Sequence, residues 1–534
     1  MFKKKLLGVS MLTMACLYGM LSIVVFLICI LCGFDMSLVL LISIIIFILQ
    51  FLLAPFFTDL TMRWFYKADF NKDIPVYLRL FIEQICKENN MKYPKVGIID
   101  DGAPNAFTYG RVKNDARIVF TRGLLELLTE DEVKAVVAHE IGHAVHYDML
   151  FMTVAQLVPL ILYYVYEIFA ASNDSDNDSG KLAAIGLVAY VFYVISQYVI
   201  LWLSRVREYY ADNFAVDATK NPNSLAEALV KIGYGLTTST SKKAKMSVSR
   251  PNTLGIFDAK SSKSLIVSSY DDGGVSKDNI KKAMRWEKWN VWAKWYEFFS
   301  THPLISKRLE AISKRSEEFN QSPYIVFDEV QQESYVDDFF VEALLILSPT
   351  ILIILGIILF IIFGLTESEI LLAVILFIPA IITLFGLIRF SRAHKNKNYK
   401  ECKVVDLLSE IKVSGVTSIP CIIKGEVIGR GDPGCMFDED FILKDDSGII
   451  FIDSKRVLKI MDLVAAVTKT KSLFGQQVKI KGWYRRSPVP YVEIHEMEVV
   501  GGTKKKFYSY IIKKIFLLIL LILCTIGPII LLII

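Results

Sequence analysis

Long apolar runs alternate with polar stretches along the chain. A helix needs about 20 mainly apolar residues to cross a bilayer. Runs of this length lie at residues 11–32, 37–55, 149–170, 182–203, 342–364, 368–388 and 515–534. Short polar loops at 33–36, 171–181 and 365–368 join six of them in pairs. The pattern therefore predicts seven membrane-spanning helices.

Two stretches between the spans have the patterns of water-soluble structure. In the first, residues 58 to about 147, apolar spacing predicts an amphipathic helix at 75–90 and strands at 95–100 and 116–120. Asn105, Ala106 and Phe107 lie between these strands. The segment is either an edge strand that pairs with an extended peptide or a hairpin packed on the following helix.

In the second soluble stretch, alternating apolar positions predict strands at 421–428, 441–443, 449–452, 477–483 and 491–498. Five such strands with turns between them predict a small, OB-like β-barrel. Basic and aromatic residues gather near its fourth strand: Lys479, Lys481, Trp483, Tyr484, Arg485 and Arg486. They form either a nucleic-acid face or, as we favour, the solvated side of a strand near anionic lipid.

Two further segments have distinctive compositions. Residues 237–276 are rich in Ser, Lys, Gly and Asp, which predicts a flexible insertion, either a plain loop or a lid or autocleavable loop. A helix predicted at 281–299 carries Trp286, Trp289, Trp292 and Trp295. This aromatic face rests on the membrane interface or packs in a core.

Composition and charge support a membrane protein. The chain has 534 residues, of which 53% are hydrophobic, more than in usual globular proteins. A net charge of +5 is too small to indicate a nucleic-acid partner. The three short loops hold a single basic residue, Lys181, so the positive-inside rule predicts a cytoplasmic N-terminus, cytoplasmic soluble stretches and an external C-terminus. The eight cysteines imply no disulfide framework.

Candidate chemistry begins with the run Ala138-His139-Glu140-Ile141-Gly142-His143. Thr129 and Glu132 predict a capping box, and apolar residues follow at helical spacing, so the motif lies on a helix. Histidines at i and i+4 share one helix face and can bind one ion, with Glu140 beside them to take a proton from the attacking water. Three of only six histidines fall within eight positions here. This is the HExxH arrangement of zinc peptidases.

A catalytic zinc site needs a third protein ligand. Residues 204–215, SRVREYYADNFA, place Glu208 and Asp212 one helical turn apart. We expect Glu208 to be the third ligand and Asp212 to accept the second ring N–H of His139. By itself, such a pair flanked by arginines is typical of a solvated charged helix; beside an HExxH motif, ligation is the better interpretation.

Four motifs in order give the chain a resemblance to HtpX-type membrane metallopeptidases, relatives of the CAAX prenyl endopeptidases and gluzincins with Glu as third ligand. They are NAFTYG at 105–110, HEIGHAVHYD at 139–148, SRVREYYAD at 204–212, and Thr301-His302-Pro303 with Arg308. The resemblance covers about the first 320 residues and leaves the OB-like domain as an addition. It implies that Glu140 is the general base, that 105–110 is the substrate-pairing edge strand, and that His302 and Arg308 lie near the oxyanion.

His146 departs from the pattern expected of this family. It lies two turns from His139, about 10 Å along a helix axis at 1.5 Å per residue, and is too far away to bind the same ion. We expect it outside the ligand set, behind the ligands or on the surface.

The sequence thus predicts a mainly α-helical integral membrane protein with a cytoplasmic gluzincin-type α+β protease domain. The predicted parts are two N-terminal spans (1–57), the protease domain with a transmembrane hairpin at 149–203 (58–335), a second hairpin (336–392), the OB-like domain (393–505) and a last span (506–534).

The expected function is that of a zinc endopeptidase with one Zn²⁺ per chain, acting in the cytoplasmic membrane on membrane or misfolded proteins. Resemblance to the prenyl endopeptidases would instead imply lipidated C-terminal substrates, which we favour less because the spans are too few for a large enclosed chamber. An alternative from another class is a membrane-tethered binding or scaffold module whose C-terminal β domain carries the function. The sequence indicates no oligomeric state.

Overall fold

The structure is a computed structural model, and it describes most of the chain. Described residues are 2–32, 41, 45, 48, 52–53, 56, 58–64, 66–70, 72–102, 104–170, 179–238, 270–271, 274–275, 277–327, 334–366, 368–395, 398–430, 441–453, 475–487, 489–500, 504–506 and 509–533. The chain divides into two compact units. One comprises Met1–Ser262 and Trp295–Val326, and the other comprises Lys263–Lys294 and Phe327–Ile534.

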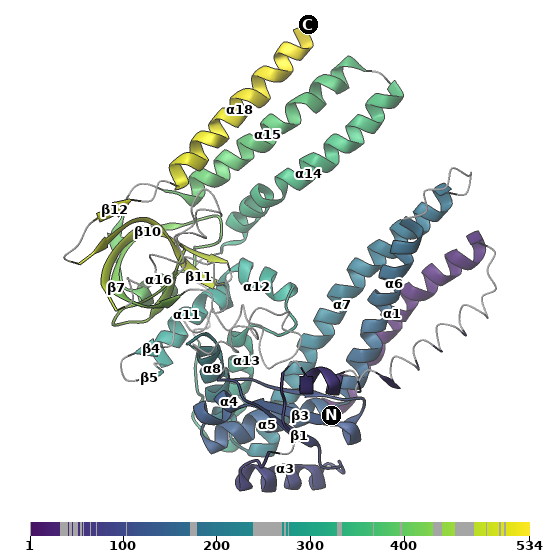
Figure 1. The fold of residues 1–534 in the computed structure, drawn as a ribbon, viewed down its shortest axis with the longest axis vertical. Coiled ribbons are helices and arrows are strands. Elements are labelled where there is room, and N and C mark those ends of the chain that lie inside the picture. Colours follow the sequence, from purple (N-terminus) through teal and green to yellow (C-terminus); the bar gives the residue numbers. More distant parts are fainter. Residues whose placement is uncertain are drawn as a thin grey trace. The chain divides into compact units, whose positions relative to one another are not determined.

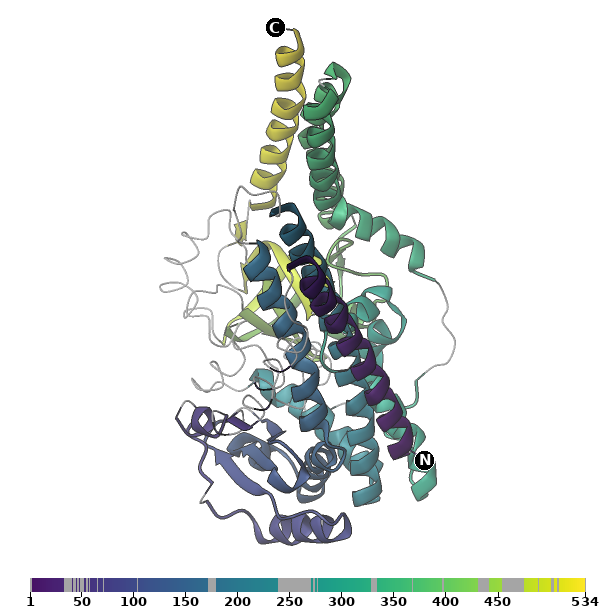
Figure 2. The same ribbon diagram turned by 90° about the vertical axis from the view of Figure 1, so that its right-hand side faces the viewer.

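Three long apolar helices lie side by side in the first unit: α1 (Phe2–Cys32), α6 (Asp148–Ala170) and α7 (Ser179–Thr219) (Figures 1 and 2). Buried side chains from all three, including Leu17, Val158 and Ile185, form one apolar cluster. α7 runs past the predicted span without a break, and at 41 residues it is about 60 Å long, twice the thickness of a bilayer core. Its C-terminal part therefore extends the span into the soluble part of this unit.

Six helices in the described residues are long and apolar enough to cross a membrane. They confirm six of the seven predicted spans as helices. The remaining predicted span, 37–55, lies outside the described residues apart from isolated positions. The insertion predicted at 237–276 also lies almost wholly outside them; its described part is the end of α8 and a two-stranded ladder of β4 (Tyr270–Asp271) and β5 (Gly274–Val275).

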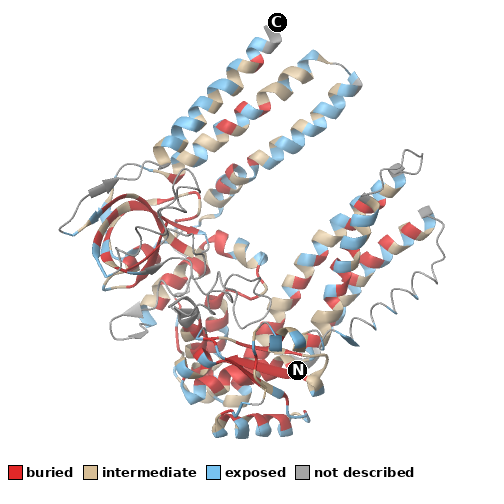
Figure 3. Cartoon of the chain, viewed as in Figure 1, coloured by how far each residue is buried: buried red, intermediate tan, exposed pale blue. Residues whose placement is uncertain are grey.

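The soluble part of the first unit surrounds a buried central helix, α5 (Glu130–Val145) (Figure 3). Around it lie α3 (Val76–Glu88), α4 (Arg122–Leu127), α8 (Pro222–Thr238) and α13 (Ile305–Lys314). A small sheet has the order β1-β3-β2, with β1 (Lys95–Ile99) parallel to β3 (Arg117–Thr121) and β2 (Ala106–Tyr109) antiparallel to it. The predicted strands are confirmed, and β2 is an edge strand.

The second unit joins three apolar helices to a β-barrel. The helices are α14 (Val336–Thr366), α15 (Glu369–Ala393) and α18 (Ser509–Ile533). The barrel strands are β7 (Ile419–Arg430), β8 (Phe441–Lys444), β9 (Ile449–Asp453), β10 (Gln477–Ser487) and β11 (Val489–Val499). Their order is β7-β8-β9-β11-β10, and pairing of β10 with β7 closes the ring. The predicted five-stranded barrel is thus confirmed. Short strands β6 (Lys400–Glu401) and β12 (Lys504–Lys506) extend it, and α16 (Val404–Ser409) precedes β7.

The prediction that β10 carries a solvated or nucleic-acid-binding face is wrong for Trp483, Tyr484, Arg485 and Arg486, whereas Lys479 and Lys481 are partly exposed. Trp483 and Tyr484 are fully buried, and Arg486 is 1% exposed. The Arg486 guanidinium lies over the Trp286 ring and donates to the carbonyl of Ala283 at 3.1 Å. From Gly482 to Arg486 both faces of the strand are covered, because the barrel interior lies on one side and other parts of the unit lie on the other.

The outer cover of β10 comes from the ends of two apolar helices. The Trp483 ring lies 4.8 Å from that of His394, which follows α15, and 5.0 Å from that of Tyr510 at the start of α18. Arg485 is buried beside them and pairs with Glu493 at 2.8 Å. Sequence spacing within β10 could not reveal the contacts with His394 and Tyr510, because these two residues belong to other elements of the chain.

The single tryptophan-rich helix predicted at 281–299 is also wrong. α11 (Lys277–Trp289) ends before Asn290, and α12 (Val291–Phe298) follows it. The Asn290 side-chain oxygen accepts from the backbone N–H of Trp292 at 2.8 Å, as an N-cap residue does, so a new helix begins there. Trp286 and Trp292 are buried, so core packing is confirmed for these two, whereas Trp295 is 39% exposed.

Candidate active site

α5 presents the two histidines of the HExxH motif on one face. Its first turn contains the predicted capping box, in which Thr129 N donates to Glu132 Oε2 at 2.8 Å. The rings of His139 and His143 meet edge to face with 4.8 Å between their centroids. Their Nε2 atoms lie 3.2 Å apart, so both nitrogens can face one ion.

α7 lies close against α5 at Gly142. A Cβ atom there would lie 3.2 Å from the Cα of Ala211 and from the side chain of Phe214, so a larger residue would push the helices apart. The close approach brings Glu208 to the histidines. Its Oε2 lies 3.6 Å from His139 Nε2, and its Oε1 lies 3.7 Å from His143 Nε2.

His139, His143 and Glu208 form a group whose ligand atoms all lie within 4.8 Å of one another. Zinc binds imidazole nitrogen and carboxylate oxygen at about 2.0–2.2 Å, which puts neighbouring ligand atoms about 3.4 Å apart in a tetrahedron. The separations of 3.2, 3.6 and 3.7 Å match this spacing. Two imidazoles and one carboxylate also match the donor set of catalytic zinc sites, so the residues fit a zinc ion.

A carboxylate holds each histidine by its second ring nitrogen. Asp212 Oδ1 lies 3.0 Å from His139 Nδ1, and Asp148 Oδ2 lies 2.7 Å from His143 Nδ1. Such partners fix the tautomer and turn Nε2 towards a metal. Burial lowers the pKa of His143, but the hydrogen bond to Asp148 and the nearby carboxylate of Glu208 raise it to about 9.

Asp148 had no role in the sequence-based prediction. It begins α6, three residues after the end of α5 at Val145, and pairs with the buried Arg207 of α7. Arg207 also donates to the Ser10 hydroxyl of α1 at 2.6 Å. The available signal was a carboxylate five residues after His143, at the point where the catalytic helix meets the apolar run.

Arg308 of α13 connects two carboxylates of α7. Its Nε and Nη2 donate to the two oxygens of Asp212 at 2.9 and 2.7 Å, and Nη1 lies 3.3 Å from Glu208 Oε2. Burial lowers the pKa of the Arg308 guanidinium, but these carboxylates raise it above its ordinary value. The side chain is fully buried, and it does not line the cavity described next.

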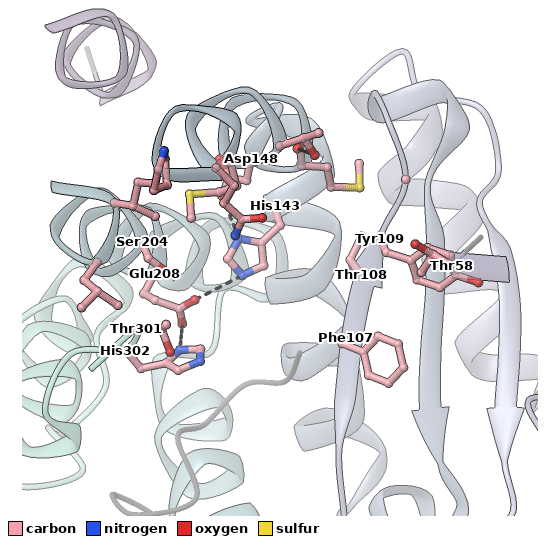
Figure 4. A pocket seen from close by; sticks show the side chains of 18 of the residues that line it. Thr58, Phe107, Thr108, Tyr109, His143, Asp148, Ser204, Glu208, Thr301 and His302 are labelled. Atoms are coloured by element: carbon pink, nitrogen blue, oxygen red, sulfur yellow. Dashed lines mark hydrogen bonds and ion pairs between the residues drawn. The ribbon is translucent and has the colours of Figure 1, made fainter. Parts of the chain in front are cut away.

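A cavity of about 820 Å³ opens beside this group, and Glu140, His143, Glu208 and His302 line it. His302 Nδ1 lies 3.2 Å from Glu208 Oε2. Figure 4 shows the other ring nitrogen of His302 facing the space between Glu208 and β2. His302 therefore has a ring nitrogen available to a bound molecule.

Glu140 is 3% exposed and lies at the cavity wall. In the part of the chain that the structure describes, no side chain is hydrogen-bonded to its carboxylate. Its backbone carbonyl accepts from the Thr108 hydroxyl at 3.1 Å, which ties β2 to α5. The carboxylate is thus available for proton transfer within the cavity.

β2 is the strand nearest to the candidate ligands (Figure 4). Its residues Phe107, Thr108 and Tyr109 line the cavity. Asn105 and Ala106, which were predicted to pair with substrate, do not line it: the Asn105 backbone is bonded to Thr121, and Ala106 is fully buried. The strand edge that faces the cavity therefore begins at Phe107.

His146 forms the C-cap of α5, and its ring packs edge to face against Tyr210 and Phe214. It is not part of the ligand group. This position agrees with the expectation that it lies too far from His139 to share an ion.

Comparison with known proteins gives consistent matches for the part of the chain that holds this site. Residues 76–316 match the model of Peptidase family M48. The chain is 39% identical to a Protease HtpX homolog of Methanothermobacter thermautotrophicus over 184 residues, which are 34% of this chain and 68% of that protein. It is 29% identical to a Protease HtpX homolog of Thermoplasma acidophilum (51% and 83%) and 30% identical to Protease HtpX homolog 2 of Saccharolobus solfataricus (53% and 88%).

Among solved structures, the chain is similar to S. mikatae Ste24p, with 19% identity and a TM-score of 0.34 over 57% of this chain and 64% of that one. The family match ends at residue 316, so the barrel and the helices α14, α15 and α18 lie beyond it.

Proposed function

The chain belongs to peptidase family M48, and from this membership and its ligand group we propose that it is a zinc endopeptidase that hydrolyses membrane or misfolded proteins at the cytoplasmic face of the membrane. The observation that carries the proposal is the convergence of His139, His143 and Glu208 at tetrahedral spacing. These three side chains would hold one zinc ion per chain. Zinc there would supply Lewis-acid chemistry, polarising a peptide carbonyl and lowering the pKa of water to about 7.

The protein's own groups supply the rest of the reaction. Glu140 has a carboxylate at the cavity wall, and it would take the proton of the attacking water and deliver it to the leaving amine. The His302 ring nitrogen that faces the cavity would donate to the oxyanion, a contribution of about 3 kcal/mol for a single donor. Asp212, Asp148 and Arg308 would keep the ligands oriented.

The β2 edge would bind the substrate backbone. Among the described residues, β2 pairs with β3 along one side, and its cavity side leaves an edge for an added strand. Antiparallel or parallel pairing would hold the substrate extended across the ligand group. This geometry suits unfolded or locally unwound polypeptides, because the backbone N–H and C=O groups of a folded helix or sheet are already hydrogen-bonded to one another.

The connections of the spans support a site at the membrane surface. α6 begins at Asp148, which contacts a candidate ligand, and α7 carries Glu208 on the same helix as its apolar part. Ser10 of α1 meets Arg207, so the first turns of the N-terminal span lie at the level of the site. The concentration of Lys and Arg on this side supports a cytoplasmic orientation.

The test is metal content measured beside peptidase activity. Purified protein should contain one zinc per chain, cleave casein, and lose cleavage when a chelator removes the metal. Glu140→Gln should keep the zinc and lower kcat by at least about 100-fold, because the general base is lost. Glu130→Gln, an exposed change in the first turn of the same helix, is the matched control and should behave as wild type. Wild-type turnover by Glu140→Gln would refute the assigned role.

A further inference from the structure

The cavity does not end at the ligand group but continues between two apolar helices. On α6 its lining residues fall at positions 149, 152, 153, 156, 159, 160 and 163, and on α7 at 193, 197, 200, 201, 204 and 208. This spacing of three or four residues marks a single stripe on each helix. The cavity is therefore a groove that follows α6 and α7 away from the ligand group.

The groove has a definite length. From Asp148 to Tyr163 on α6, and from Glu208 back to Tyr193 on α7, there are 15 residues, or about 22 Å of helix. The rings of Tyr163 and Tyr193 lie 5.5 Å apart at its far end. Since a bilayer core is about 30 Å thick, a groove of this length reaches well into the membrane.

Two side-chain amides lie in this groove, Gln156 on α6 and Gln197 on α7. Both are exposed, and within the described residues neither has a hydrogen-bond partner. An amide without partners is costly at membrane depth, where no bulk water satisfies it. Polar residues in spans commonly mark the path of a bound molecule.

A carboxamide offers one acceptor and two donors, which complement the N–H and C=O groups of a peptide backbone. The rest of the groove is largely apolar, with Met152, Leu160 and Leu201 along it. This combination suits a polypeptide with apolar side chains whose backbone is not helical. A lipid acyl chain would fit the apolar residues but would leave both amides unpaired.

We propose that the groove between α6 and α7 receives the unwound end of the substrate's own membrane span, with Gln156 and Gln197 bonding its backbone. An extended chain covers 22 Å with about seven residues. The enzyme should therefore cut within about seven residues of the membrane-buried part of its substrate. The inference rests on the proposed peptidase function and adds its substrate class and cleavage position.

The first experiment uses a single-span reporter in proteoliposomes, with an unfolded cleavable segment and spacers of increasing length between it and the span. We expect cleavage of this segment to stop once the spacer is longer than about seven residues, because the cut must stay that close to the span. The double variant Gln156→Leu/Gln197→Leu should lower kcat/KM for this reporter about tenfold, the effect of losing two hydrogen bonds. The proposal would be overturned if the cleavage site moved outward with the spacer, or if the double variant had the same kcat/KM for the reporter as the wild type.

A second experiment blocks the groove. Leu160→Trp fills it, whereas Leu187→Trp, the same change at an exposed α7 position outside the groove, is the matched control. Leu160→Trp should lower the ratio of reporter to casein cleavage about tenfold, and Leu187→Trp should not change it. A wild type that cleaves neither casein nor reporter would refute the peptidase function itself, a result distinct from failure of the groove.

Binding is measured independently of turnover in the Glu140→Gln background. A photoreactive residue at position 160 should crosslink to the reporter's span, and one at position 187 should not. Crosslinking of position 160 to lipid alone would show that the groove holds an acyl chain and would overturn the proposal.

Discussion

Replacing Arg308 with methionine tests the claim that this residue positions the metal ligands. Methionine keeps an unbranched side chain of similar length but removes the charge. It would leave the carboxylates of Asp212 and Glu208 buried without their shared partner, since Arg308 now donates to Asp212 at 2.7 and 2.9 Å and lies 3.3 Å from Glu208.

Two magnitudes follow from this geometry. Breaking a fully buried ion pair by removing one partner destabilises a protein by about 3–5 kcal/mol. Loss of a group that orients metal ligands weakens metal binding about 10- to 100-fold. We therefore expect Arg308→Met to lose both thermal stability and zinc affinity, and Arg308→Lys to recover part of each because the charge returns without the paired hydrogen bonds.

The assay is competition for zinc with a chromogenic chelator, combined with thermal unfolding of the detergent-solubilised full chain. Lys314→Met is the matched control: Lys314 ends α13 and forms an i,i+4 pair with Glu310 while its own side chain is 72% exposed, so its loss should change stability by about 1 kcal/mol or less. If Arg308→Met keeps wild-type zinc affinity and loses only kcat, then Arg308 acts on the oxyanion and the positioning role is refuted.

Two further predictions concern carboxylates. Asp148→Asn should weaken zinc binding about 10- to 100-fold in the chelator assay, because Asp148 holds the His143 ring. The control Asp131→Asn removes only an exposed pair with Lys134 and should keep wild-type zinc affinity. Equal zinc affinities of the two variants would contradict the role of Asp148. Burial raises the pKa of Glu493, but the hydrogen bond from His394 and the charge of Arg485 lower it to about 2, below its ordinary 4.5. Glu493 therefore stabilises the fold above about pH 4.5 and loses this effect as pH falls towards 2, so Glu493→Gln should cost about 3 kcal/mol at pH 7 and about 1 kcal/mol at pH 3. Thermal unfolding across this range measures the difference, and one that grows towards acid would contradict the sign.

Sequence patterns over a few residues correctly predicted the helices and strands that neighbouring residues determine. The capping box at Thr129, the helix that carries His139 and His143, and the β-barrel strands follow from spacing over a few residues, and the structure has them. The predictions that failed depend on what covers a surface. β10 has the charge and aromatic content of an exposed strand, but its second face is covered at Trp483 by residues that follow α15 and begin α18. No pattern within β10 contains that information.

The same division applies to the candidate site. Histidines four residues apart are recognisable in sequence, and so is a nearby Glu-x-x-x-Asp pair, because both lie on single helices. Arg308 was predicted from family resemblance to face the oxyanion, and its contacts with Asp212 and Glu208 support the positioning role tested above; the oxyanion role stays a prediction. The contacts that decide between these roles join residues about 100 positions apart.

A line of hydrogen bonds joins the N-terminal span to a candidate metal ligand. Ser10 of α1 accepts from Arg207 of α7, Arg207 pairs with Asp148 at the start of α6, and Asp148 accepts from His143 of α5. Each of these residues comes from a different helix, and three of the helices are candidate spans. The orientation of the His143 ring therefore depends on how α1, α6 and α7 pack together. A soluble fragment lacking the spans would keep the HExxH motif but lose Ser10, Arg207 and Asp148, which orient the His143 ring. This dependence is a physical reason why the site and its membrane helices form one compact unit.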